Sequence, residues 1–136
     1  MKKAELILSI DTASAAEITI HLGSGEKILS RKKFLAPKKQ AEKLLPAIEK
    51  LLIKNYFSLK DLSDIKVVTQ GGTFTSLRIG VITANALAFA LDIPVQAIDK
   101  EGNVVKEDMR SAGGVTIAAP HYDAEPNIGK KKIDKK

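Results

Sequence analysis

The sequence has no cysteine and only two histidines, His21 and His121. The absence of cysteine excludes disulfides, thiolate zinc sites and thiol catalysis, and it fits a reducing compartment. Two histidines cannot form a histidine-rich metal site. No apolar run approaches the roughly 20 residues of a membrane span, and Asp11 interrupts the first apolar stretch too early for a signal peptide. We therefore expect a cytoplasmic protein with no resident metal, no cofactor and no membrane contact.

Tryptophan is also absent, and aromatic residues make up 4% of the 136 positions, whereas 44% are hydrophobic and 28% charged. This length and composition are typical of one soluble globular domain. The net charge is +6, and most of it lies in the lysine-rich residues 130–136. The rest of the chain is nearly neutral, unlike a protein with a broad nucleic-acid-binding face. The lysine-rich tail either keeps the protein soluble or contacts RNA phosphates, such as those of tRNA, without sequence preference.

The first third of the chain is predicted to form three strands. Residues 5–11 have the pattern of a buried strand that ends in Asp11, and residues 16–22 alternate apolar and polar side chains. Residues 23–25 contain two glycines, which tolerate the positive φ of a hairpin turn. Residues 26–35 then complete a meander of three strands.

Two long helices and two short strands are predicted to follow. Apolar side chains at helical spacing predict an amphipathic helix over residues 38–54, which Pro46 should kink. A strand over residues 65–69 and a glycine turn precede a second helix at residues 74–91, and residues 93–98 form the last strand. The order β-β-β-α-β-α-β predicts an α/β fold with a mixed sheet and helices packed on it.

The periodic pattern weakens after residue 98, where charged residues and glycines dominate. We interpret residues 1–98 as the folded domain. Residues 99–119 are expected to be a poorly ordered linker with one short strand over residues 115–118. Residues 120–136 are expected to form an extended basic tail.

The predicted helix at residues 74–91 is apolar on nearly every side. A helix of this kind is normally buried on more than one side. Gly80, Ala84 and Ala88 form a stripe of small residues that would let another helix approach closely. The second side packs either on the helix at residues 38–54 or on another protein, and the sequence leaves both alternatives open.

Two short stretches are candidates for binding a phosphate or a metal. Asp11 and Thr12 follow the first strand, and Gly71 and Gly72 stand between a strand and a helix, where free backbone amides can bind an anion. Neither stretch matches a phosphate-binding loop or a dinucleotide fingerprint. The simpler interpretation is a carboxylate that accepts bonds from turn amides and glycines that permit a tight turn. A stand-alone nucleotide-binding or phosphoryl-transfer domain is therefore the alternative function.

Three stretches of the sequence carry recognisable motifs: ILSIDTA at residues 7–13, EKLLPAI at residues 42–48 and GTFTSLRIG at residues 72–80. The first is similar to the opening motif ILAIDTS of the TsaB (YeaZ) family of tRNA-modification proteins, and the second resembles the RLLPxI helix of that family, including Pro46. Residues 72–80, GTFTSLRIG, resemble the end of GPGSFTGLRIG, the most specific of these motifs. The resemblance covers about residues 5–98 and so includes all the predicted strands and helices of the folded domain.

The resemblance implies a single actin-like, ribonuclease H-like lobe with a role in making threonylcarbamoyladenosine in tRNA. It implies a non-catalytic relative of the catalytic subunit TsaD. The two proteins would pair through the helices at residues 38–54 and 74–91, and TsaE, an ATPase, would join the complex. A homodimer through the same helices is the other implied state. We predict six apolar residues as the partner interface: Leu44, Ile48, Leu77, Val81, Ala84 and Ala88.

The sequence also departs from the family in several places. The metal-binding His-x-x-x-His helix of TsaD has no counterpart here, which excludes TsaD itself. The proline and one glycine of GPGSFTG are replaced in residues 70–76, which leaves at most a vestigial phosphate site: Asp11, Thr12, Gly71 and Gly72. The second lobe of actin-like proteins is not found, so we expect no ATPase activity. Arg78, a cation in the first turn of its helix, should form an ion pair with Asp11 or with a partner carboxylate.

Overall fold

The elements of the fold are taken from a computed structural model, which describes residues 5–121. The strands are β1 (Ile7–Asp11), β2 (Glu17–Ser24), β3 (Lys27–Leu35), β4 (Asp64–Val68), β5 (Val95–Ile98), β6 (Met109–Ala112) and β7 (Val115–Ala118). The helices are α1 (Gln40–Lys54) and α2 (Phe74–Leu91), and the short 3-10 turns are η1 (Leu59–Asp61) and η2 (Lys106–Asp108). The predicted order of strands and helices up to β5 is confirmed.

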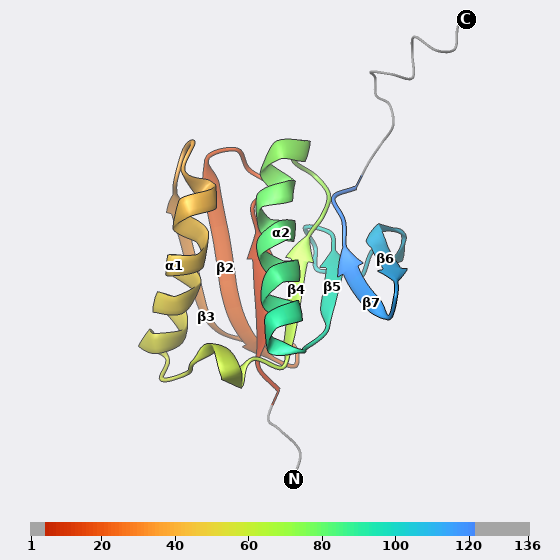
Figure 1. Ribbon diagram of the computed structural model, residues 1–136. Coiled ribbons are helices and arrows are strands. Elements are labelled where there is room, and N and C mark those ends of the chain that lie inside the picture. Colours follow the sequence, from red (N-terminus) through yellow and green to blue (C-terminus); the bar gives the residue numbers. More distant parts are fainter. Residues whose placement is uncertain (1–4, 122–136) are drawn as a thin grey trace, which may run out of the picture.

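Five strands form one mixed sheet in the order β3-β2-β1-β4-β5 (Figure 1). β2 runs antiparallel to both β1 and β3, because short turns connect these three strands. β4 runs parallel to β1, and β5 runs parallel to β4, since a helix precedes each of them. The carboxyl ends of β1 and β4 therefore lie at the same end of the sheet.

Both long helices pack on one face of this sheet, with α1 over β2 and β3 and α2 over β1, β4 and β5 (Figure 1). The amphipathic pattern of α1 decides which side faces the sheet, because Leu44, Ile48, Leu51 and Leu52 are buried on one side and the charged residues are exposed. α1 continues as one helix through Pro46, which is exposed. The largest fully buried side chains between the two layers are aliphatic: Leu8, Ile10, Ile18, Ile20, Leu22, Leu44, Ile48, Leu52, Ile65 and Val67.

Local signals fix both ends of α2. Oγ1 of Thr73 accepts a hydrogen bond from the N–H of Ser76 at 3.0 Å, which caps the first turn. At the other end Asp92 adopts a left-handed φ of 57°, and Pro94 follows two residues later. By length and composition α2 could cross a membrane, but one side of it packs on the sheet in this fold.

Residues 99–119 are folded, which corrects the expectation of a poorly ordered linker. At the position of the expected strand, residues 115–118, lies β7, which pairs antiparallel with β6, a strand that was not predicted. Asn85 attaches this hairpin to α2. Its amide donates to the carbonyl of Ala118 at 2.9 Å and accepts from the N–H of Ala118 at 2.9 Å. Of the predicted basic tail, residues 120–136, all but residues 120 and 121 lie outside the described residues.

Candidate functional site

The predicted vestigial phosphate site lies where β1 and β4 end. Asp11 is the last residue of β1, and its Oδ1 accepts a hydrogen bond from the N–H of Ala13 at 2.9 Å. Oδ2 of Asp11 lies 3.6 Å from Nζ of Lys100, which follows β5. We expected Arg78 as a possible partner of Asp11, but Arg78 lies over the ring of Phe74, 5.5 Å from its centroid. The cation beside Asp11 is therefore Lys100.

Thr12 links β1 to α2. Its side chain is fully buried, and its hydroxyl donates to the carbonyl of Ser76 at 2.6 Å. The same hydroxyl oxygen accepts from the N–H of Gly80 at 3.1 Å, one helical turn further along. The hydroxyl of Thr12 is thus occupied by bonds within the chain. Its role is to hold α2 against the end of β1.

The glycine loop is packed against the end of β1. A Cβ on Gly72 would overlap the backbone carbonyl of Ala13, so no larger residue fits there without a shift of the backbone. Gly71 has a φ of 86°, a conformation that favours glycine. These contacts are those of a tight turn, and a phosphate-binding role for the loop stays a prediction. Within residues 5–121 no cluster of three or more histidine or carboxylate side chains could hold a metal ion.

A buried polar cluster at the end of β4 was missed by the sequence analysis. Oδ2 of Asp108 accepts a hydrogen bond from the hydroxyl of Thr69 at 2.8 Å, and both side chains are buried. Oδ1 of Asp108 lies 3.0 Å from Nδ1 of His121. The N–H of His121 donates to the carbonyl of Thr69 at 2.8 Å. The cluster ties the segment after β7 to β4. No local motif could have revealed it, because Thr69 and Asp108 are 39 residues apart.

The six residues predicted to contact a partner lie in the core of the chain itself: Leu44, Ile48, Leu77, Val81, Ala84 and Ala88. This placement corrects the prediction of which side of each helix faces outward. A Cβ on Gly80 would lie 2.7 Å from Oγ1 of Thr12, so the small-residue stripe allows α2 to approach β1 closely. The small residues therefore allow α2 to pack on the sheet of the same chain.

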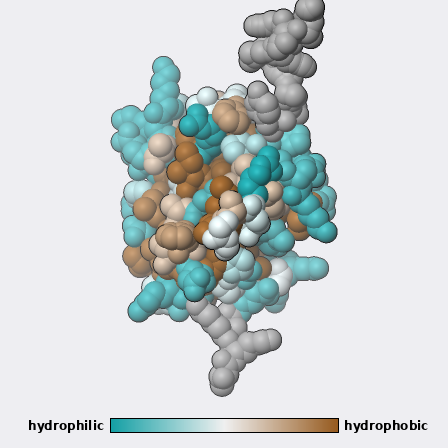
Figure 2. Space-filling model, turned by 45° about the vertical axis from the view of Figure 1, so that its right-hand side comes forward, coloured by the Kyte–Doolittle hydropathy of each residue, from teal (hydrophilic) through white to brown (hydrophobic). Residues whose placement is uncertain are grey.

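Large apolar side chains are nevertheless exposed on the outer sides of both helices. On α2, Phe74, Ile82 and Phe89 recur every seven or eight residues and so lie along one side, and Ile82 is 59% and Phe89 75% exposed. On α1, Leu45 and Ile53 are exposed. The helices lie side by side in front of the sheet, so their outer sides face the same way (Figure 1). Figure 2, which brings the right-hand side of that view forward, shows hydrophobic residues gathered across the middle of the surface.

The sheet order and the two helices on one face define the class of protein: a single lobe of the actin-like, ribonuclease H-like fold. A solved structure of the same fold is YeaZ from Pseudomonas aeruginosa. It superposes with a TM-score of 0.63 at 22% sequence identity, covering 86% of this chain and 65% of that chain.

Sequence comparisons then identify the family. Residues 28–111 match the family model described as TsaD, tRNA N6-adenosine threonylcarbamoyltransferase. The chain is 34% identical to the tRNA threonylcarbamoyladenosine biosynthesis protein TsaB of Bacillus subtilis (strain 168), over 87% of this chain and 50% of that protein. It is 26% identical to the TsaB of Escherichia coli (strain K12), over 83% of this chain and 48% of that protein. The chain belongs to the TsaB (YeaZ) family, and it spans about half the length of these curated relatives.

Proposed function

We propose that this chain is a non-catalytic scaffold subunit in the synthesis of N6-threonylcarbamoyladenosine in tRNA. In this proposal it binds a TsaD-like catalytic subunit through the outer sides of α1 and α2, and a TsaE-like ATPase joins through that subunit. Family membership supports a role in this tRNA modification, because relatives such as the TsaB of Bacillus subtilis are named for it. The proposed complex works in the cytoplasm.

The exposed apolar side of α2 is the observation that carries the proposal. Ile82 and Phe89 are more than half exposed, and covering such side chains contributes roughly 1.5–3 kcal/mol each. Apolar and aromatic residues with an adjacent arginine are typical of the centre of protein–protein interfaces. Arg78 lies over Phe74 on this same helix. A helical partner could cover this surface together with Leu45 of α1.

A matched pair of substitutions tests this surface. Ile82→Glu places a charge on the outer side of α2, whereas Ile28→Glu makes the same change on β3, where the isoleucine is similarly exposed at 53%. An unpaired charge in a desolvated interface typically costs a few kcal/mol. We expect Ile82→Glu to weaken binding to the TsaD-like protein of the same genome at least about tenfold, measured by titration calorimetry.

The control Ile28→Glu should bind like the unsubstituted chain, and circular dichroism should show both variants folded. Equal affinity of Ile82→Glu and the unsubstituted chain would refute this surface as the interface. A homodimer through the same surface is the competing occupant. It would appear as loss of self-association in Ile82→Glu with no effect on the TsaD-like partner.

The alternative function, a stand-alone nucleotide-binding or phosphoryl-transfer domain, gains no support from the strand-end site. The hydroxyl of Thr12 is used by α2, and the glycine loop packs on the end of β1. We expect the purified chain to release no phosphate from Mg-ATP above the buffer rate. Turnover that disappears in Asp11→Asn would contradict the non-catalytic assignment.

A further inference from the structure

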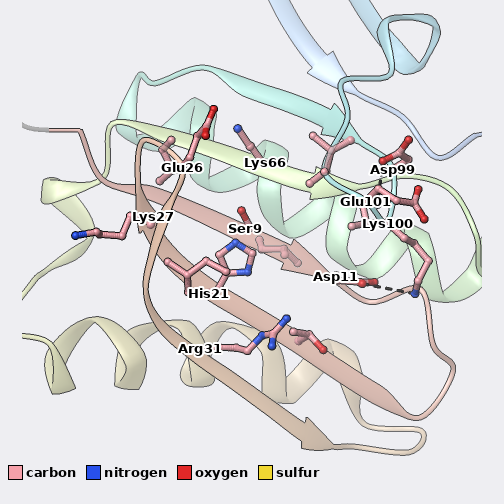
Figure 3. A pocket seen from close by; sticks show the side chains of 18 of the residues that line it. Ser9, Asp11, His21, Glu26, Lys27, Arg31, Lys66, Asp99, Lys100 and Glu101 are labelled. Atoms are coloured by element: carbon pink, nitrogen blue, oxygen red, sulfur yellow. Dashed lines mark hydrogen bonds and ion pairs between the residues drawn. The ribbon is translucent and has the colours of Figure 1, made fainter.

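The sheet face opposite the helices contains a hollow of about 560 Å³ (Figure 3). Strands β1, β2, β3 and β4 form its floor. One rim is the tip of the β2–β3 hairpin, residues 23–28, and the other is the turn after β5, residues 98–102. Both long helices of the described part lie on the other face (Figure 1). The size is that of a pocket for a small molecule.

Four polar side chains form one row across this floor. The register places Arg31 of β3 opposite His21 of β2, and His21 opposite Ser9 of β1. Lys66 of β4 is the parallel neighbour of Ser9. Residues that face each other in neighbouring strands point to the same side of a sheet. Figure 3 shows His21 between Arg31 and Ser9, with Lys66 beyond Ser9.

The side chains of this row lack partners within residues 5–121. Ser9 is only 8% exposed, and its hydroxyl forms no hydrogen bond there. A buried hydroxyl without a partner is unfavourable and is rare in folded proteins. Neither Arg31 nor Lys66 forms an ion pair in this part of the chain, whereas Lys100 in the same hollow is paired with Asp11.

Within residues 5–121 no carboxylate forms an ion pair with the positive charges of the row. Burial, together with the positive charges of Arg31 and Lys66, lowers the pKa of His21. The carboxylates of the rims are exposed or already occupied. Asp99 accepts hydrogen bonds from the N–H groups of Glu101 at 3.0 Å and Asn103 at 2.9 Å.

We propose that this row is a binding site for the phosphate group of a small phosphomonoester. Arg31 and Lys66 supply the charge, because a guanidinium and an ammonium are the preferred cations for phosphate. Ser9 donates its hydroxyl, and His21 donates a ring N–H. The acidic side chains Glu26 and Glu101 on the rims repel a long polyanion such as RNA, and this favours a small ligand. The proposal does not depend on the scaffold function.

The two histidines of the chain make a direct test possible. Nuclear magnetic resonance of the imidazole Cε1–H groups would show two signals, and His21→Asn assigns them. Inorganic phosphate and adenosine monophosphate are the probes, with chloride at equal ionic strength as the reference. We expect both probes to shift the His21 signal in a saturable way and to raise the pKa of His21, because an anion offsets the two cations.

Matched variants locate the site. Lys66→Gln and Arg31→Gln should each lower the affinity for both probes about tenfold, since each removes a charge-assisted hydrogen bond. Ser9→Ala should lower the affinity several-fold without loss of stability. Lys32→Gln removes the same charge from the residue next to Arg31, on the other side of β3, and should leave the affinity unchanged.

Three results would overturn the proposal. The first is a His21 shift with phosphate that equals the shift with chloride. The second is an equal effect of Lys66→Gln and Lys32→Gln. The third is binding of inorganic phosphate without binding of adenosine monophosphate, which would exclude a phosphomonoester.

Discussion

The two faces of the five-stranded sheet are built from alternate residues of the same strands, yet the helix side is apolar, whereas a row of polar side chains crosses the other side. On the helix side Leu8 and Ile20 are fully buried, whereas on the other side Ser9 and His21 line an open hollow. Parallel strands such as β1 and β4 are normally covered on both faces. The difference shows that the helices stabilise one face, while the polar face is available for a ligand or for further protein.

The largest expected effect is a loss of stability when a residue on the inner side of α1 is shortened, compared with the same change on its outer side. Leu44→Ala should lower the free energy of unfolding by about 2–5 kcal/mol, because it leaves a cavity in the core. Leu44 is fully buried, whereas the next residue, Leu45, is 41% exposed. Leu45→Ala should therefore cost less than about 1 kcal/mol. Urea unfolding of both variants measures the difference, and equal losses would contradict the placement of α1.

A smaller effect is expected for the hydroxyl that links the sheet to α2. Thr12→Val keeps the shape of the side chain but removes its bonds to Ser76 and Gly80. We expect a loss of about 1–3 kcal/mol. Thr19→Val on the open face removes a hydroxyl of the half-buried floor and should change stability by less than about 0.5 kcal/mol. Thermal unfolding compares the pair, and a larger loss for Thr19→Val would break the contrast between the faces.

The smallest effect is a pH dependence from the open face. Burial and the charges of Arg31 and Lys66 hold the pKa of His21 below its ordinary value of 6.5, so the unfolded chain binds the proton more tightly. Stability is then fully present above that value and declines as the pH falls through the window below it. His21→Gln should remove this part of the decline. Urea unfolding at about pH 7.5 and about pH 5.5 tests this, and an unchanged slope in His21→Gln would contradict the assignment.

Local sequence signals predicted most of the fold. The predicted ends of α2 agree with the structure, because Thr73 caps the first turn of the helix and Asp92 follows its last turn. β6 was missed, because its MRSA sequence lacks an apolar alternation and the strand forms by pairing with β7. Tertiary pairing of this kind leaves no periodic pattern.

The candidate site could be predicted only in part. The stretches around Asp11 and Gly72 do meet at one end of the sheet, because parallel strands share a direction. Periodicity could not show which side of α2 faces the sheet, since the helix is apolar all round; the close approach of Gly80 to Thr12 decides it. The row on the open face depends on the register of four strands, which a single sequence does not reveal.

Light scattering on a sizing column, with and without the TsaD-like protein of the same genome, tests the scaffold assignment most directly. The scaffold assignment predicts a stable 1:1 complex, formed either from the monomer or from a homodimer that the partner converts. A monomer whose mass does not change when the partner is added would contradict it. The apolar side of α2 with Ile82 and Phe89 would then not be the partner surface of this chain.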